Sequence, residues 1–355
     1  MGPSTRTAWI DIAKGLSIIL VVMMYSAYNT GEYTGETGFL HYVIGFATPF
    51  RMPEFFLISG LFLSRVIDRP WRRYADRRGV HYFYFYALWA FIMIALKVGL
   101  FARAPVQMAQ DLATAVVEPY GVLWFIYMLG VFGLVAKLIR QANVPHWIVL
   151  PVAALLQMAQ IQSPSYVVTQ FAAYFVFFYA GYVFAPLVFR VADWAIANKG
   201  QGAAALVAWA LVNGVLVFSP GFQVLPSHTE MGYAAFPPLH LALAVAGALA
   251  ICVFSALVAG ARSAEWLRWL GEHSLVVYLA FTIPMSLFRA AMLRADLITD
   301  TGLLSTAVLV VATASPAVLY WIVKRTGFGT FLFERPAWAH IDRPRRVPPK
   351  VVAAE

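Results

Sequence analysis

The chain has 355 residues, of which 61% are hydrophobic and 12% charged, and it carries a net charge of +9. An ordinary soluble domain holds about twice this share of charged residues. The composition therefore excludes a water-soluble globule, a disordered chain and a nucleic-acid-binding protein. The single cysteine, Cys252, lies in an apolar run, so we interpret it as a packed hydrophobic residue. One cysteine excludes an internal disulfide framework and a cysteine zinc site.

Long apolar stretches predict an all-α, polytopic membrane protein with about ten transmembrane helices. Each such helix needs about 20 mostly apolar residues. The stretches cover residues 8–28, 40–63, 80–101, 121–139, 146–162, 168–189, 203–219, 237–260, 269–289 and 302–323. We expect one transmembrane domain over residues 1–330. The Pro- and Arg-rich residues 331–355 are expected to form a disordered cytoplasmic tail.

The distribution of basic residues predicts an N-in, C-in topology. With the N-terminus in the cytoplasm, the cytoplasmic segments hold 20 of the 26 Lys and Arg residues. The opposite side holds only Arg103 and Arg294. Such a bias orients a membrane protein, and the positive segments also suit contact with anionic lipids of the bilayer. The first stretch carries Asp11 and Lys14 and lacks a small-residue cleavage site, so we expect a permanent first helix.

Ionisable residues within membrane spans are costly, which makes them candidates for function. On the first helix, Asp11 and Lys14 are three residues apart and can pair on one face. Tyr25 follows Lys14 by eleven residues, about three turns, so both side chains point the same way, about 16 Å apart along the axis. Alternatively, Asp11 and Lys14 are interfacial charges that reach toward water, and Tyr25 is a core residue.

The second span contains a predicted helix break with two charged residues. Pro49 and Pro53 lie four residues apart and interrupt the helix within the bilayer. Irregular backbone at this depth is tolerated where it is buried in protein or lines a cavity. Arg51 and Glu54 lie at the break and can neutralise each other. We interpret them as functional, although a buried ion pair can also serve structural specificity.

A basic segment follows the second span. Residues 65–78 hold six arginines, Arg72 and Arg73 among them. The positive-inside bias explains most of this charge. Arginine also binds phosphate through two parallel hydrogen bonds, so a cytoplasmic phosphorylated substrate can dock here. The two interpretations are compatible.

Two further segments carry weaker signals. Trp124 begins the fourth span, where it is either a wall of a binding site or an interfacial anchor. His273 lies near the cytoplasmic end of the ninth span, where it is either a general base or a solvated surface histidine. The other histidines have no metal-ligand spacing, and no glycine-rich phosphate loop is present. We therefore expect no metal and no bound cofactor.

Several segments, in this order, resemble the membrane acyltransferase 3 family of bacterial envelope-modifying enzymes. They are WIDIAKG and VVMMY in the first helix, FRMPEFFLISG with the basic segment after it, LWFIYML, and LGEHSLVVYLAF. The resemblance implies ten spans and an acyl-CoA donor. It implies transfer of an acetyl, succinyl or similar group to a hydroxyl of an envelope glycan or glycolipid. It also implies a location in the bacterial plasma (inner) membrane.

The chain departs from the family pattern at its histidine positions. Lys14 and Tyr25 stand where relatives carry Arg and His, and Arg51 and Phe281 stand where relatives carry His. Glu54 replaces a usual Leu. Without the imidazole base, we expect Glu54 to deprotonate the acceptor.

The remaining candidates receive supporting roles. Tyr25 is expected to hydrogen-bond an oxyanion, and Lys14 to hold a donor phosphate or the thioester oxygen. Ser59 and Trp124 are expected to shape the acyl pocket. The substrate-binding set is Arg51, Asp11, Ser59, Arg72, Arg73, Trp124 and His273. Two other functions stay open: a transporter of an envelope precursor, because a broken helix with charged groups also fits a carrier, and a non-catalytic partner in envelope-polymer assembly.

Overall fold

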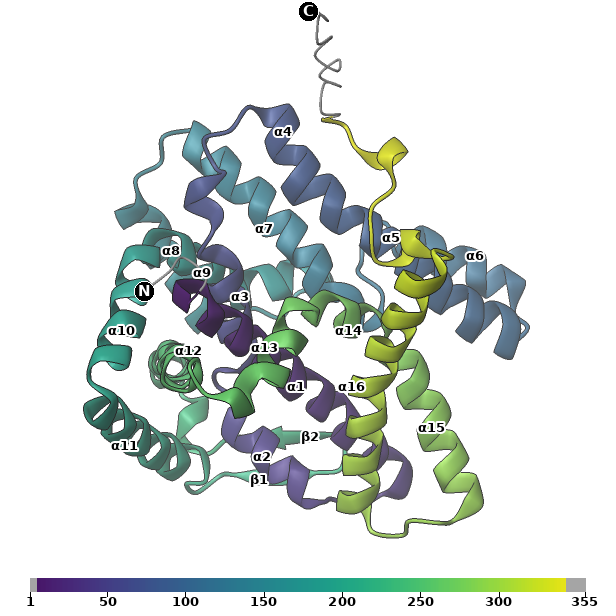
Figure 1. Ribbon diagram of the computed structural model, residues 1–355. Coiled ribbons are helices and arrows are strands. Elements are labelled where there is room, and N and C mark those ends of the chain that lie inside the picture. The colour runs from purple at the N-terminus through teal and green to yellow at the C-terminus, as the bar shows by residue number, and fades with distance from the viewer. Residues whose placement is uncertain (1–4, 343–355) are drawn as a thin grey trace, which may run out of the picture.

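The computed structural model describes residues 5–342 and is almost entirely helical (Figure 1). Its α-helices are α1 (Thr5–Thr34), α2 (Phe39–Ala47), α3 (Arg51–Gly60), α4 (Trp71–Ala75), α5 (His81–Ile94), α6 (Pro105–Thr114), α7 (Trp124–Gln141), α8 (His146–Met158), α9 (Tyr166–Val183), α10 (Ala185–Ala197), α11 (Lys199–Val217), α12 (Pro237–Val258), α13 (Glu265–Glu272), α14 (Ser274–Ala280), α15 (Thr282–Ala295) and α16 (Thr301–Thr326). Strands β1 (Gln223–Leu225) and β2 (His228–Glu230) form one short antiparallel hairpin. The predicted all-α membrane fold is confirmed.

Within residues 5–342, seven helical segments are long and apolar enough to cross a membrane, and each coincides with a predicted span. They are Ala8–Thr34, Trp71–Phe101, Gly121–Gln141, Tyr166–Val183, Lys199–Val217, Pro237–Val258 and Thr301–Thr326. The second begins nine residues before its predicted start at residue 80. Part of the predicted basic loop is therefore helical, because α4 runs through the π-helical turn Asp76–Val80 into α5.

The other three predicted spans are not single long helices; within residues 5–342, seven helices, or eight with one bent pair, have the length and apolarity of a single span. Residues 40–63 form α2 and α3, separated at Pro49, because proline lacks the N–H that would continue the helix. The fifth stretch forms α8, which has 13 residues. The ninth is divided among the end of α13, α14 and α15, and the last two meet at an angle of 52°.

Close helix packing around α1 and α3 depends on glycines. Helix α1 contacts α13 through Gly15 and Gly271, and α3 contacts α9 through Gly60 and Gly181. A Cβ atom on Gly181 would lie 2.1 Å from the carbonyl oxygen of Leu57. Small residues let helix backbones approach closely inside a bilayer, where van der Waals contact drives association. These contacts hold α1, α3, α9 and α13 in one core (Figure 1).

Segments between spans that were predicted to lie on the same side of the membrane contact each other in the structure. At the end assigned to the cytoplasm, Arg140 pairs with Asp68 at 3.0 Å, and Lys137 donates a hydrogen bond to the carbonyl oxygen of Ile67. At the other end, Tyr28 contacts Thr229 through their hydroxyl groups at 2.7 Å. This grouping agrees with the predicted sides, and the N-in, C-in orientation stays a prediction.

The expected tail is structured over its first part. Residues 331–342 run back along α5 and contact α4 (Figure 1). Trp89 of α5 donates a hydrogen bond to the carbonyl oxygen of Leu332, and its ring lies 5.8 Å from that of Phe333. The expectation of disorder is therefore wrong for this stretch, because a tertiary surface on α4 and α5 receives it. Residues 343–355 lie outside the described part of the chain.

Candidate functional site

A cavity of about 210 Å³ lies among five helices in the core. Its walls come from α1, α3, α7 with the turn before it, α9 and α14. The lining residues are Val21, Met24, Tyr25, Arg51, Met52, Phe55, Val122, Trp124, Phe125, Tyr166, Gln170, Tyr174 and Tyr278. Apolar and aromatic walls with a few convergent polar groups are typical of small-molecule sites.

The charge in this cavity comes from Arg51. Its side chain is buried, and it lines the cavity next to Tyr25 and Tyr174. Within residues 5–342, its Nε and Nη1 atoms have no hydrogen-bond partner. In the described part of the chain, no Asp, Glu or His lines the cavity. The cavity is therefore lined by one cationic side chain and several side chains that carry hydroxyl groups.

Two further sequence candidates meet Arg51 at the cavity. Tyr25 and Trp124 both line it, and their side chains are hydrogen-bonding neighbours. The ring of Tyr25 lies 5.6 Å from that of Phe281. The three positions at which relatives carry histidine, occupied here by Tyr25, Arg51 and Phe281, thus lie close together in space, although the sequence separates them widely.

Glu54 is not at this cavity, and the predicted ion pair with Arg51 is not formed. The carboxyl group is fully buried and contacts the hydroxyl of Ser17 on α1. The Ser17 hydroxyl also lies 2.8 Å from the carbonyl oxygen of Ala13, which can only accept. A hydroxyl has only one proton to donate. When Ser17 donates this proton to the carbonyl oxygen of Ala13, the Glu54 carboxyl group is the donor in its hydrogen bond with Ser17. This arrangement joins α1 to α3 beside the cavity.

If the protein transfers acyl groups, as the sequence resemblance implies, we expect Glu54→Gln to retain this activity within about threefold of the wild type, because the amide can donate the same hydrogen bond to Ser17. The variant and the wild type are compared by transfer of labelled acyl groups, with folding checked by size-exclusion chromatography and thermal unfolding. A loss of about 100-fold or more in a folded protein would return Glu54 to the mechanism as the base.

The remaining helix-1 candidates and two others lie away from the cavity. Asp11 and Lys14 form the predicted pair, with the carboxylate 3.2 Å from the ammonium group, and neither lines the cavity. Ser59 donates its hydroxyl proton to the carbonyl oxygen of Phe55 in its own helix. His273 stacks on the ring of Trp269 and contacts that residue's carbonyl oxygen at 2.9 Å.

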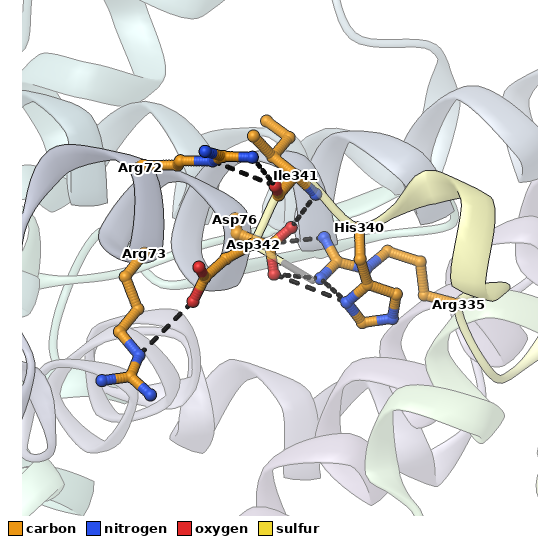
Figure 2. A network of polar contacts seen from close by, with 7 residues as sticks. All are labelled: Arg72, Arg73, Asp76, Arg335, His340, Ile341 and Asp342. Atoms are coloured by element: carbon orange, nitrogen blue, oxygen red, sulfur yellow. Dashed lines mark hydrogen bonds and ion pairs between the residues drawn. The ribbon is translucent and has the colours of Figure 1, made fainter. Parts of the chain in front are cut away.

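The arginines predicted to bind a donor phosphate contact the C-terminal segment instead. Arg72 donates two hydrogen bonds to the carbonyl oxygen of Ile341, at 3.1 and 2.9 Å. Arg73 pairs with Asp342 at 3.4 Å. Figure 2 shows both arginines turned toward this segment. A phosphorylated ligand would therefore have to displace residues 341 and 342 from these side chains.

A buried carboxylate anchors the same network. Asp76 accepts hydrogen bonds from Arg335 and from the backbone N–H of Ile341, both at 2.6 Å (Figure 2). The side chains of Asp76 and Arg335 are only 5% and 4% exposed. Charge-assisted bonds of this length are strong when both partners are shielded from water. Sequence reasoning missed this pair, because nothing local connects residue 76 with residue 335.

Sequence reasoning also missed the contribution of α9. Tyr166, Gln170 and Tyr174 are spaced four residues apart and line the cavity together. Side chains at this spacing share one helix face. A polar stripe on an otherwise apolar helix was therefore a signal that periodicity could have found. Tyr278 was within a quoted segment, and its hydroxyl contacts the carbonyl oxygen of Val122.

Comparison with known proteins identifies the family. A family model described as an acyltransferase domain matches residues 7–321. The chain belongs to this acyltransferase family. The inner membrane protein YcfT of Escherichia coli (strain K12) is 37% identical over 95 residues, which cover 23% of this chain and 26% of that protein. The match thus spans about a quarter of the curated relative. No solved structure matches significantly.

The cavity is lined by residues from segments that resemble the acyltransferase family. Four of the segments that carry the resemblance, VVMMY, FRMPEFFLISG, LWFIYML and LGEHSLVVYLAF, contribute residues from four different helices to its lining, whereas WIDIAKG does not. The basic segment after α3 does not. Among residues 5–342, no group of three or more His, Cys, Asp or Glu residues is placed to hold a metal ion.

Proposed function

We propose that this protein is an integral-membrane acyltransferase. It would move an acetyl, succinyl or similar group from acyl-CoA to a hydroxyl of an envelope glycan or glycolipid, in the plasma membrane of a bacterium. The convergence of the four family segments on the Arg51 cavity carries this proposal. Similarity to an inner membrane protein supports the location.

In the proposed reaction, the acceptor occupies the aromatic cavity with its hydroxyl next to Tyr25. The acceptor oxygen attacks the thioester carbonyl, the carbon–sulfur bond breaks, and the acceptor's proton ends on the CoA thiolate. Tyr25 would donate a hydrogen bond to the oxyanion that forms in between. The lining holds no ordinary base, so its proposed contribution is positioning and oxyanion stabilisation.

The donor is proposed to approach from the predicted cytoplasmic side. There a second hollow of about 370 Å³ is lined by Ser64, Arg65, His146 and Tyr182, among others. Arg72 and Arg73 are held by the C-terminal segment, whereas Arg65 of the same basic segment lines this hollow. Arg65 is therefore the arginine that we propose for contact with a donor phosphate. Lys14 stays a proposed second contact.

The test uses purified protein in vesicles with labelled acetyl-CoA or succinyl-CoA and envelope glycolipids as acceptors. We expect label in the glycolipid fraction, and we expect Tyr25→Phe to reduce its rate by about 10² to 10³, the effect of losing one oxyanion donor. Tyr127→Phe is the matched control, because its hydroxyl donates a hydrogen bond to the carbonyl oxygen of Val116 and lines neither hollow. Movement of a glycolipid across the membrane without acylation would instead support the transporter.

A further inference from the structure

The side chain of Arg51 is 8% exposed, and its unpartnered nitrogens belong to a residue that lines the cavity. A buried cation without a counter-charge is costly, because the interior cannot replace the water that solvated it. Among residues 5–342, no acidic side chain lines the cavity or forms an ion pair with Arg51. Glu54, the nearest acidic residue along α3, contacts Ser17 on α1 instead.

We propose that the cavity binds a substrate carrying a carboxylate, which pairs with Arg51. A planar guanidinium matches a carboxylate through two parallel hydrogen bonds. One guanidinium balances one negative charge, and the lining has no second cation, so a carboxylate fits better than a phosphate dianion. This inference rests on the proposed function, which places a substrate in this cavity.

The shape of the cavity limits the size of the ligand. Its volume of about 210 Å³ is below the range of about 300–1,000 Å³ that is typical for drug-sized ligands. It therefore admits one sugar ring or a short acyl chain. Tyr166, Tyr174 and Trp124 provide aromatic walls, and the Gln170 amide provides a further donor and acceptor. The carboxylate can belong to an acidic acceptor sugar or to a dicarboxylic acyl group.

Binding of five small probes to the full-length protein in detergent tests this inference without acyl transfer. Methyl glucuronide is compared with its neutral twin methyl glucoside, and monomethyl succinate with dimethyl succinate. We expect one acid to bind at least thirtyfold more tightly than its twin, as is typical of a buried charge pair. The acid that binds identifies the source of the carboxylate. Inorganic phosphate is the fifth probe.

Two variants assign the binding to Arg51. We expect Arg51→Gln to lose the preference for the acid, and Arg289→Gln to retain it. Arg289 is a matched control, because it is equally buried but lies over the ring of Tyr33, outside the cavity. If Arg51→Gln does not fold, Arg51→Lys should retain a weaker preference for the acid.

Three outcomes would overturn the inference. The first is that the wild-type protein binds each acid no more tightly than its neutral analogue, or binds none of the probes. The second is tighter binding of phosphate than of either acid. The third is an acid preference that survives in Arg51→Gln. If the protein binds the acid but transfers no acyl group, the proposed function is contradicted and this inference is not. If it transfers acyl groups to neutral acceptors and shows no preference for acids, this inference is contradicted and the proposed function is not.

Discussion

Replacing Gly271 with alanine is expected to prevent stable folding. A Cβ atom at this position would lie 1.6 Å from the carbonyl oxygen of Asp11 and 2.9 Å from the backbone nitrogen of Gly15. The obstructing atoms belong to the backbone of α1, so no side-chain rotation relieves the clash. Overpacking of a core typically costs about 1–3 kcal/mol, and a clash with the backbone of a central helix should reach or exceed the upper value.

The measurement is the yield and thermal unfolding temperature of Gly271→Ala in detergent, beside Gly200→Ala as the matched control. Gly200 is also helical, and an added Cβ atom meets nothing within 4 Å. We expect the control to behave like the wild type, because alanine is the better helix former. Wild-type yield and stability of Gly271→Ala would show that α13 does not pack against α1 as described.

Replacing Asp76 with alanine is expected to release the C-terminal segment. The substitution removes the acceptor for Arg335 and for the backbone of Ile341, and it leaves a buried guanidinium without its counter-charge. Breaking a buried ion pair from one side costs about 3–5 kcal/mol. We expect chymotrypsin to cleave after Trp338 far faster than in the wild type, with the products measured by mass spectrometry.

Arg73→Ala is the matched control for Asp76→Ala. Its ion pair with Asp342 is exposed, and such pairs contribute about 0–1 kcal/mol, so chymotryptic cleavage after Trp338 should change little. Wild-type protease resistance of Asp76→Ala would mean that the aromatic contacts of Phe333 and Trp338 alone hold the segment. The same variant tests whether Arg72 binds the acyl donor. Release of the C-terminal segment frees Arg72 from Ile341, and binding of labelled acetyl-CoA to Asp76→Ala measures the effect.

The local parts of the site were predictable. Asp11 and Lys14 pair because three residues along a helix bring side chains to one face. The break before α3 occurs at Pro49, where a helix cannot continue. Tyr25, Arg51 and Trp124 were candidates from their residue types and positions, and all three line one cavity.

The partners of Arg51 and Glu54 were not predictable. The two residues are neighbours on α3, but Arg51 lies at a cavity shared with α9 while Glu54 contacts α1. Which neighbouring helix each side chain meets depends on how three helices pack. That packing involves contacts far apart in the sequence, and residue spacing within one helix carries no information about it.

The amino-acid sequence by itself determined the membrane environment, most of the long helices, the break in the second span and the family. These follow from hydropathy, proline chemistry and motifs, all of which act over short stretches. Only the tertiary structure decided which motif residues share a cavity, that Arg51 is left without an acidic partner there, and that residues 331–342 dock on α4 and α5. Such outcomes depend on close backbone packing at glycines and on burial of Asp76 opposite Arg335, contacts that exist only once the chain is folded.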